Sequence, residues 1–327
     1  MWRRSPSTSA PSAPRFSPGS APPTAKSASA PTAPPRAPKP PGEGTSVGYL
    51  AGIDVGSRMT RSVLVDDHGR VQARTGRETG ARLEAAAQAV LDELCATQRI
   101  KPEEILYVAS TGYGRYRVLF RQIQITEMTC HGVGARWLFP GTRTVLDIGA
   151  MNSRALRLAD SGRVAAFRMN DRCASGAGRF LERVAKALEV KLEDVGELSL
   201  RAQNPQPISS ICAVLAESEV INHVTAGASV EDILCGAHFS IAERLVALVR
   251  QVGAQPEITL TGGVSKNAGL VRALEERLGV KLNVSPHSEY AGALGAALLA
   301  RARWQRLADA VGGARVQSCE AAREEPA

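Results

Sequence analysis

The sequence has no long apolar run, few aromatic residues, and only six cysteines in 327 residues. A membrane-spanning helix needs about 20 consecutive apolar residues, so the first of these absences excludes a transmembrane span. Six scattered cysteines are too few for the disulfide framework of a secreted protein, and the sequence shows no apolar signal region. We therefore expect a cytoplasmic protein with no membrane partner.

The net charge of +8 is concentrated in residues 1–46, where six Lys or Arg face a single acid, Glu43. That segment carries +5 of the total and holds 12 of the 19 prolines. Because aromatic residues make up only 4% of the chain and the remaining charge is small, nucleic-acid binding loses its main support. The segment has too few large apolar side chains to form a core, so we expect a disordered Pro/Ala/Ser-rich tail. Its proline density argues against the amphipathic helix of an organellar targeting peptide.

After residue 47 the chain contains an internal repeat. The run IDVGSRMTRSVLVDDHGRV (Ile53–Val71) aligns without gaps on LDIGAMNSRALRLADSGRV (Leu146–Val164), at a constant offset of 93 residues. Each copy has the pattern of an apolar strand ending in Asp-x-Gly, a second strand, a turn built on Asp-x-Gly-Arg, and a third strand. Helical patterns follow at residues 81–96 and 178–188. Two copies of this unit predict two similar α/β domains that face each other.

The Asp-x-Gly turn that ends each first strand has the chemistry of a metal and phosphate site. A carboxylate at a strand end, followed by glycines with open backbone N–H groups, can hold a hydrated Mg²⁺ beside a phosphate. A single turn of this kind is more often only a tight turn, but two facing copies favour a clamp around a metal-bound phosphate. The clamp would consist of Asp54, Gly56 and Ser57 on one side and Asp147 and Gly149 on the other.

A third glycine site lies in EITLTGGVSKNAGLVRALEERLGV, where a β-rich strand at residues 258–261 runs into Gly262 and Gly263 and then a helix. Paired glycines at this place let the backbone approach a flat ring or a sugar closely. Downstream, residues 289–301 have the pattern of a small-residue helix, and Gly292 and Gly295 let that helix cross another element tightly.

This assembly resembles the actin, hexokinase and Hsp70 superfamily of ATP-binding folds over about residues 47–310. The resemblance implies two ribonuclease-H-like domains, at residues 47–142 and 143–310, with an ATP cleft between them. We expect the last helix, which includes residues 289–301, to cross back to the first domain. Residues 311–327 are expected to be a flexible tail. The expected catalytic residues are Asp54 and Asp147. The expected ATP and Mg²⁺ site comprises Gly52, Asp54, Gly56, Ser57, Arg58, Asp147, Gly149, Gly262, Gly263, Asn267 and Gly292.

Two cysteines precede predicted helices: Cys173 in MNDRCASGAGRFLE and Cys212 in ISSICAVLAESEVINHV. Open N–H groups and the helix dipole at such positions favour a thiolate. Two thiolates are half of a four-cysteine site, which a dimer would complete around one shared iron–sulfur cluster. Zinc is the competing metal, although zinc sites normally take C-x-x-C pairs from one chain. The cysteines without comparable context are Cys95, Cys130, Cys235 and Cys319.

Six stretches together resemble the ATPase family of benzoyl-CoA reductase and of the activators of 2-hydroxyacyl-CoA dehydratases: MNDRCASGAGRFLE, ISSICAVLAESEVINH, STGYGR, TEMTCHGVGA, LTGGVSKN and YAGALGAALLA. In that family two cysteines from each of two chains bind one 4Fe-4S cluster, which by position implies Cys173 and Cys212 as ligands here. The resemblance implies that ATP hydrolysis drives electrons at low potential into a partner. The implied partners are a homologous ATPase chain or a second copy, acyl-CoA-binding catalytic subunits, and a ferredoxin-like or flavodoxin-like donor.

One segment departs from the family pattern. Where the family commonly has Asp-Ile-Gly-Gly-Gln-Asp, this chain has DIGAMN (Asp147–Asn152). The leading carboxylate and first glycine remain, so phosphate and Mg²⁺ binding are still expected. Met151 and Asn152 replace an amide and a carboxylate, which affects the groups that position the γ-phosphate or the hydrolytic water. We interpret this departure as favouring an ATPase chain of benzoyl-CoA reductase, with a 2-hydroxyacyl-CoA dehydratase activator as the alternative.

Two further interpretations stay open. A small-molecule kinase of the same superfamily would use an aspartate such as Asp171 to deprotonate a substrate hydroxyl. No sugar-binding run is evident, however, and the two cysteines would then have no role. An ATP-sensing regulatory subunit would bind the nucleotide without hydrolysing it, and an ATPase assay separates that interpretation from the others.

Overall fold

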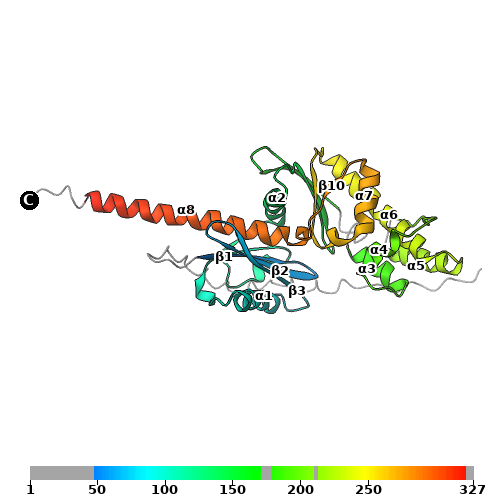
Figure 1. Cartoon of the computed structure of the whole chain (residues 1–327), viewed down its shortest axis with the longest axis horizontal. Helices are drawn as coiled ribbons and strands as arrows, with labels where there is room; N and C mark the ends of the chain where they lie inside the picture. Colours follow the sequence, from blue (N-terminus) through cyan, green and yellow to red (C-terminus); the bar gives the residue numbers. More distant parts are fainter. Residues whose placement is uncertain (1–47, 171–177, 210–212, 322–327) are drawn as a thin grey trace, which may run out of the picture. The chain divides into compact units, whose positions relative to one another are not determined.

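The computed structural model describes residues 48–170, 178–209 and 213–321, and these contain two five-stranded sheets with helices packed on both faces (Figure 1). The expected N-terminal tail and both cysteines of interest, Cys173 and Cys212, lie outside these residues. Within the described ranges, no helix is both long enough and apolar enough to cross a membrane. The predicted α/β class is confirmed.

The first sheet has the strand order β3-β2-β1-β4-β5. Its strands are β1 (Tyr49–Val55), β2 (Met59–Asp66), β3 (Val71–Glu78), β4 (Ile105–Thr111) and β5 (Ile123–Gln124). The first three strands form an antiparallel meander, and β4 and β5 continue the sheet in parallel.

The second sheet repeats this arrangement with the order β8-β7-β6-β9-β10. Its strands are β6 (Thr144–Ile148), β7 (Ser153–Leu158), β8 (Val164–Met169), β9 (Ile258–Thr261) and β10 (Leu282–Asn283). The meander β6-β7-β8 is again antiparallel, and β9 and β10 again pair in parallel.

The repeat extends to details of the backbone. The ladder between the second and third strands shifts register between Leu64 and Val65, and it shifts at the equivalent position 93 residues later. The turn glycines Gly69 and Gly162 have φ angles of 83° and 79°, a conformation that glycine adopts without strain. The Asp-x-Gly-Arg pattern therefore predicted both turns correctly.

Eight α-helices and four short 3₁₀ helices connect the strands in the described residues. The α-helices are α1 (Leu83–Gln98), α2 (Glu127–Leu138), α3 (Gly178–Ala187), α4 (Val195–Ser199), α5 (Ala213–Thr225), α6 (Val230–Gln251), α7 (Ala268–Leu278) and α8 (Ala291–Ala321). The 3₁₀ helices are η1 (Pro102–Glu104), η2 (Arg115–Arg117), η4 (Gly263–Lys266) and η5 (Ser288–Tyr290). The helices predicted at residues 81–96, 178–188 and 289–301 correspond to α1, α3 and the start of α8.

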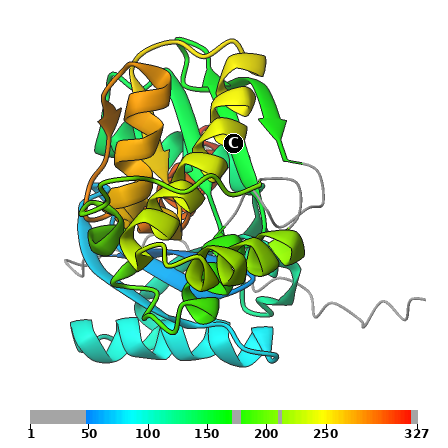
Figure 2. The same cartoon turned by 90° about the vertical axis from the view of Figure 1, so that its right-hand side faces the viewer.

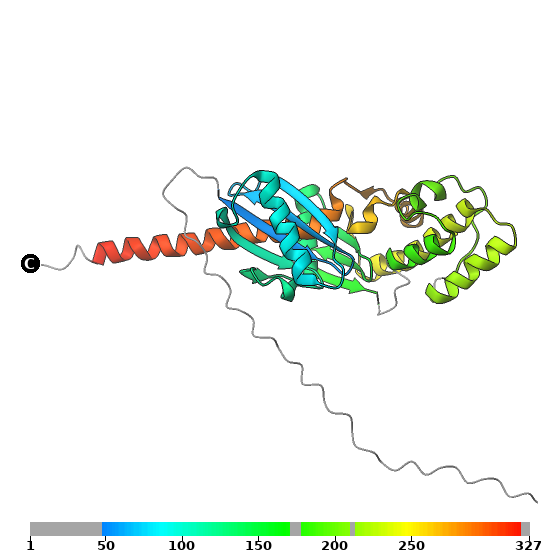
Figure 3. The same cartoon turned by 90° about the horizontal axis from the view of Figure 1, so that it is seen from below.

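Alternate residues of β1 point to different helices, as expected for the two-residue period of a strand. Ile53 and Val55 join α1 in one hydrophobic cluster, whereas Leu50 joins α8 in another. Figures 1 and 3 show α1 and α8 on opposite faces of the first sheet. In the second sheet, Val145 of β6 packs with α2, while Leu146 packs with α3, α6 and α7. The helices α6 and α7 lie side by side (Figure 2).

The two helices α2 and α8 cross each other, and glycines make the crossing close. A Cβ atom at Gly134 of α2 would collide with the backbone at Ala291, and one at Gly295 of α8 would collide with the backbone at Cys130. The helix α2 contacts β6, β7 and β9 of the second sheet, whereas α8 contacts β1, β2 and β4 of the first. This helix pair therefore connects the two sheets next to their first strands.

Candidate functional site

A cavity of about 520 Å³ is lined by the turns that follow β1, β6 and β9. That volume lies within the roughly 300–1,000 Å³ typical of small-molecule sites. The repeat supplies Asp54, Gly56, Ser57, Arg58, Met59 and Arg61 from its first copy and Asp147, Gly149, Ala150, Met151, Asn152 and Arg154 from its second. Further lining residues are Gly262, Gly263, Val264, Lys266, Asn267 and Glu289, with others from α2, α3 and α4. Most of the residues expected at an ATP and Mg²⁺ site therefore lie around one cavity.

The carboxylates of Asp54 and Asp147 occupy equivalent places, and a glycine makes room for each. Gly112 and Gly262 have φ angles of 90° and 89°. A Cβ atom at Gly112 would collide with Oδ1 of Asp54, and one at Gly262 would crowd Oδ1 of Asp147. Both positions therefore require glycine for conformation and for space. Gly112 belongs to the motif STGYGR, but it was not among the site residues expected from the sequence.

The side chain of Asp54 lines the cavity and is half-buried, and no hydrogen bond or ion pair joins it to another described residue. Burial raises the pKa of this carboxyl above its usual value, while the nearby His131 and Arg61 oppose that effect. A carboxylate that faces a cavity without an ion-pair partner is a suitable ligand for a cation or for its bound water.

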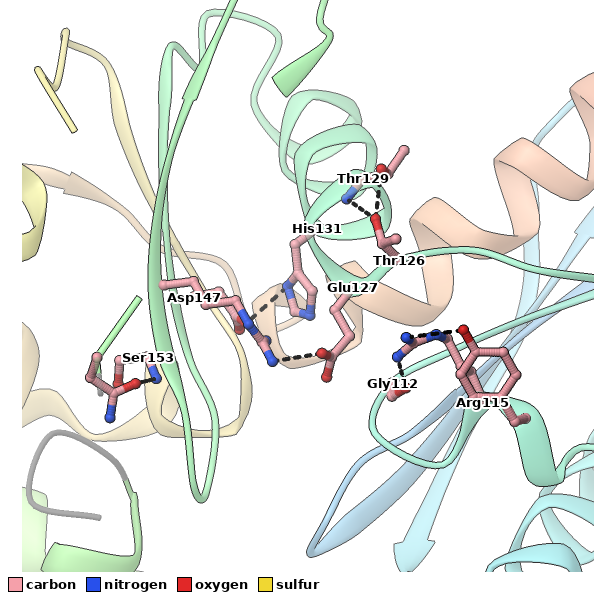
Figure 4. Close-up of polar contacts among 11 residues, drawn as sticks. Gly112, Arg115, Thr126, Glu127, Thr129, His131, Asp147 and Ser153 are labelled. Carbon is pink, nitrogen blue, oxygen red and sulfur yellow. Dashed lines mark hydrogen bonds and ion pairs between the residues drawn. The ribbon is translucent and has the colours of Figure 1, made fainter. Parts of the chain in front are cut away.

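The side chain of Asp147, which lies near Glu127 and His131 in Figure 4, is instead held by Arg154 of β7. Nη1 of Arg154 donates a 2.9 Å hydrogen bond to Oδ2 of Asp147, and Nη2 lies 2.6 Å from Oε2 of Glu127, in the first turn of α2. Burial alone would lower the pKa of Arg154, but the two carboxylates outweigh it and the pKa is raised. Burial also raises the pKa of Glu127, and Arg154 opposes that rise.

One turn further along α2, His131 completes this network. Its Nδ1 lies 3.0 Å from Oγ1 of Thr261, at the end of β9, and 3.5 Å from Oδ1 of Asp147. The ring is almost fully buried. Its Nε2 edge faces Gly292, where a Cβ atom would collide with both the ring and the Asp54 carboxylate. A single imidazole therefore lies between the two aspartates of the repeat.

Arg61, the counterpart of Arg154 in the first copy, has a different partner. Its Nε and Nη2 donate hydrogen bonds of 3.2 and 2.9 Å to Oε2 of Glu289 in η5. Lys266 of η4 forms an ion pair with the other oxygen of Glu289. The carboxylate of Glu289 therefore joins a strand of the first sheet to the loop that follows β9.

The start of α3 is attached to the turn between β6 and β7. The backbone N–H of Gly178 donates a 2.9 Å hydrogen bond to the carbonyl of Gly149, and that of Arg179 donates one of 2.9 Å to the carbonyl of Ala150. One turn later Glu182 forms an ion pair with Arg58, which belongs to the turn after β1. The helix α3 therefore contacts both turns of the repeat.

Three of the residues expected at the ATP site do not have, or do not have only, the predicted role of lining the cavity. Gly52 and Gly292 are not among the described residues that line the cavity. Gly52 packs against the backbone of α8, and Gly292 lies beside the carboxylate of Asp54. Asn267 does line the cavity, and its Oδ1 also accepts a 2.9 Å hydrogen bond from the N–H of Leu270 as the N-cap of α7.

Cys173 and Cys212 lie outside the described residues, so their roles stay predictions. Within the described ranges, no group of three or more His, Cys, Asp or Glu side chains forms a metal site. Burial raises the pKa of the Cys95, Cys130 and Cys235 thiols, in the case of Cys130 to about 12. These three thiols therefore lack the thiolate character that a metal ligand or nucleophile needs.

Sequence reasoning did not identify Glu127, His131 or Arg154 as site residues. A signal for the first two was present, because they stand four residues apart in TEMTCHGVGA and therefore share one face of a helix. A signal for Arg154 was also present, since the repeat aligns it with Arg61.

Two equivalent β-meanders, each ending its first strand in an aspartate over a common cavity, define a protein of the actin, hexokinase and Hsp70 class of ATP-binding folds. The chain belongs to the BadF/BadG/BcrA/BcrD ATPase family, whose model matches residues 51–300. The fold and family inferred from the sequence motifs are confirmed.

Individual relatives cover most of the folded chain. The activator of lactoyl-CoA dehydratase from Anaerotignum propionicum is 41% identical over 252 residues, which is 77% of this chain and 97% of that protein. One of the chains of benzoyl-CoA reductase from Thauera aromatica is 39% identical over 272 residues, which is 79% of this chain and 95% of that protein. A solved structure of the 2-hydroxyisocaproyl-CoA dehydratase activator from Clostridium difficile, with bound ADPNP, matches with a TM-score of 0.76 and 38% identity. That match covers 79% of this chain and 96% of the other.

Proposed function

We propose that the cavity binds and hydrolyses Mg-ATP. The observation that carries this proposal is that two equivalent Asp-x-Gly turns, at Asp54 and Asp147, line one cavity of suitable volume. The N–H groups of Gly56 and Gly149 are not open as expected, because they donate hydrogen bonds to the carbonyls of Met59 and Asn152. Other N–H groups of the two turns would therefore bind the phosphate oxygens. Gly262 and Gly263 would lie along the adenosine, because glycines there leave the backbone accessible to a flat ring or a sugar.

The residues present fit a Mg²⁺ ion. The carboxylate of Asp54 faces the cavity with no protein partner among the described residues, and its burial penalises the ionised form until a cation is near. When bound, Mg²⁺ would neutralise phosphate charge and polarise the phosphoryl group. Asp54 would hold the ion through its hydration shell, while the N–H of Gly56 donates a 3.1 Å hydrogen bond to the carbonyl of Met59 and stabilises the turn itself.

The hydrolysis would serve electron transfer through an iron–sulfur cluster held by Cys173 and Cys212. Support comes from the helices that follow these cysteines in the sequence, since α3 and α5 begin at Gly178 and Ala213 and contact each other. An ion pair of 4.0 Å between Arg183 and Glu217 also joins them. Two cysteines per chain require a dimer of this protein or a pair with a homologous chain to complete a 4Fe-4S site.

The contacts of α3 supply a short route from the phosphates to the cluster. Hydrogen bonds at Gly178 and Arg179 attach the helix to the turn after Asp147, and Glu182 attaches it to the turn after Asp54. A change in the separation of the two turns on ATP binding or hydrolysis would therefore act on the helix that follows Cys173. The surroundings of a cluster, including nearby dipoles and hydrogen bonds to sulfur, set its reduction potential.

As the partner we propose an acyl-CoA-binding enzyme of the 2-hydroxyacyl-CoA dehydratase kind, with this chain as its cytoplasmic activating ATPase. The support is the match to two such activators over nearly their whole length. A second candidate is an ATPase chain of a benzoyl-CoA reductase, supported by the match to a chain of that enzyme and by the altered turn Ala150–Asn152. In either case a ferredoxin-like or flavodoxin-like protein would donate the electrons.

Anaerobic purification of the full chain, followed by ATPase, iron and sulfide assays, tests the proposal. We expect Mg-dependent ATP hydrolysis and one cluster per dimer. Nucleotide binding without hydrolysis would replace the proposal by the ATP-sensing subunit, and phosphate transfer to a small molecule would replace it by the kinase. The oligomer formed distinguishes the two partner candidates, because a homodimer fits an activator and a requirement for a homologous chain fits the reductase.

A further inference from the structure

The two copies of the repeat are equivalent in backbone but differ in their charge pairing. Arg61 and Arg154 occupy the same position of the second strand, directly opposite the aspartate of each first strand. In the first copy the arginine pairs with Glu289 and leaves Asp54 without a partner. In the second copy the arginine pairs with Asp147 itself.

The glutamates beside the crossing helices receive the two arginines differently. Arg61 forms an ion pair with Glu289, just before α8, and Arg154 forms one with Glu127, in the first turn of α2. Arg61 gives its Nε and Nη2 to the glutamate alone, whereas Arg154 divides its two Nη atoms between Glu127 and Asp147. The side chain of Arg154 is only about a tenth exposed, so both of its pairings are shielded from water.

We propose that the two aspartates have different functions: Asp54 alone holds the metal, and Asp147 holds Arg154, a positioning residue that places a fixed positive charge beside the phosphates. This inference rests on the proposed function, since it presupposes that the cavity binds Mg-ATP. It replaces a symmetric clamp, in which both aspartates would share the ion, by an ion on one side and a guanidinium on the other.

Electrostatics favours this division. The carboxylate of Asp147 is already neutralised by a hydrogen-bonded guanidinium, and a metal ion there would have to displace a buried charge that Glu127 also holds in place. Asp54 lines the cavity without such a partner among the described residues, so a cation there displaces no existing ion pair. A fixed guanidinium stabilises the charge of a transferring phosphoryl group without reorganisation, which is the use of arginine in such sites.

His131 keeps the two functions apart. Its Nδ1 edge contacts Thr261 and Asp147 on the second sheet, while its Nε2 edge faces the Asp54 carboxylate across Gly292. The imidazole therefore occupies the direct path between the aspartates. Its Nδ1 lies 3.5 Å from Oδ1 of Asp147, while Oδ2 accepts the hydrogen bond from Arg154, so the buried ring supports this orientation of Asp147.

The test measures metal binding and turnover separately on the full chain. Mn²⁺ binding is followed by electron paramagnetic resonance with a non-hydrolysable ATP analogue, and the affinity for the analogue is measured independently. We expect Asp54→Asn to weaken Mn²⁺ binding roughly 10–100-fold. Asp147→Asn should leave it within about threefold while kcat falls about 100-fold, the usual scale for losing one charge-stabilising group. The exposed Asp160→Asn, in the turn between β7 and β8, is the matched control.

Arg154→Met is a second test variant. It is needed because Asp147→Asn removes one partner of a buried guanidinium and thereby destabilises the fold. We expect Arg154→Met to bind Mn²⁺ at least as tightly as the wild type, since Asp147 is freed for the ion, with kcat reduced and KM for ATP nearly unchanged. Arg154→Lys should restore part of kcat. Equal loss of Mn²⁺ binding in Asp54→Asn and folded Asp147→Asn, or weaker Mn²⁺ binding in Arg154→Met, would overturn the inference alone. A wild-type protein that binds neither the analogue nor Mn²⁺ would overturn the proposed function as well.

Discussion

The backbone N–H of Gly178, the first residue of α3, donates a 2.9 Å hydrogen bond to the carbonyl of Gly149 in the turn after Asp147. This bond attaches the helix that follows the predicted cluster ligand Cys173 directly to a predicted phosphate-binding turn. A second attachment, the ion pair between Glu182 and Arg58, leads to the other turn. Because one helix contacts both turns, its position depends on their separation, and this dependence leads to a test of coupling.

Replacing Glu182 by Gln removes the ion pair to Arg58 and should uncouple hydrolysis from electron transfer. We expect ATP hydrolysis to change by only a few fold, while the number of electrons delivered per ATP falls by more than half. The stability should change by less than about 1 kcal/mol, because both side chains are 30–40% exposed and such pairs contribute little. Phosphate release and acceptor reduction, measured in the same reaction, give the ratio.

The matched control is Glu243→Gln, which removes an exposed ion pair between α6 and α7 far from both turns in the sequence. Glu182→Asp should keep part of the coupling, since it retains the charge. An unchanged ratio of electrons to ATP in Glu182→Gln would show that α3 does not transmit the state of the nucleotide through Arg58.

Replacing Asp54 by Asn should abolish Mg-ATP turnover and leave the fold intact. The carboxylate makes no hydrogen bond or ion pair with another described residue, so the fold loses no contact, but the predicted metal ligand is gone. We expect kcat to fall by at least about 100-fold. Phosphate release at saturating ATP and circular dichroism of the same sample provide the measurement. Normal hydrolysis in the folded variant would remove Asp54 from the mechanism.

Much of the fold was predictable because the sequence contains an internal repeat. The ungapped alignment of residues 53–71 on 146–164 predicted the two meanders, and Asp-x-Gly-Arg predicted the turns at Gly69 and Gly162, since these features depend on local backbone preferences. The crossing of α2 and α8 was not predictable in the same way. The small-residue pattern with Gly292 and Gly295 predicted that this helix crosses another element tightly, but the identity of that element depends on Gly134 meeting the start of α8 more than 150 residues later.

The site shows the same division between local and long-range information. Asp54 and Asp147 stood out because each ends a predicted strand and precedes a glycine. Glu127 and His131 were missed because they lie on α2, which precedes the second sheet in the sequence and gains its importance only by packing on that sheet. The different pairing of Arg61 and Arg154 is likewise invisible in the alignment, which shows the two as equivalent. It arises from the glutamates that the crossing helices bring to them.

The wild-type protein should lose stability at acid pH because of the buried His238, and replacing His238 by Leu should prevent that loss. Neither ring nitrogen has a hydrogen-bond partner in the described structure, and burial lowers the pKa of this histidine to about 3. The unfolded chain binds a proton below about pH 6.5 and the folded chain does not, so the free energy of unfolding falls as the pH drops from 6.5 toward 3. The slope is up to about 1.4 kcal/mol per pH unit, so wild type should lose about 2 kcal/mol by pH 5.

Urea unfolding of wild type and His238→Leu at pH 7.5 and 5 measures this difference. The variant should lose about 2 kcal/mol less than wild type between these values. The control is the same substitution at His68, whose side chain is 71% exposed, and it should follow wild type. Parallel losses in wild type and His238→Leu would show that the histidine is protonated in the folded protein or is not buried in solution.

Replacing either Cys173 or Cys212 by Ala should eliminate the iron–sulfur cluster. If each supplies one ligand to a cluster shared by two identical chains, a single substitution removes two of four ligands, and both variants lose the chromophore together. ATP binding should persist, because the aspartates and glycines that line the cavity are unchanged, but the dimer should weaken and electron transfer should stop. Anaerobic iron and sulfide content per dimer gives the measurement, with Cys95→Ala and Cys235→Ala as controls whose thiols have raised pKa values. A wild-type protein with about one zinc and no sulfide would indicate the competing metal, and a Cys173→Ala protein with its iron intact would exclude Cys173 as a ligand. In a pair with a homologous chain only one ligand is lost, so partial retention of the cluster in both variants would identify the mixed assembly.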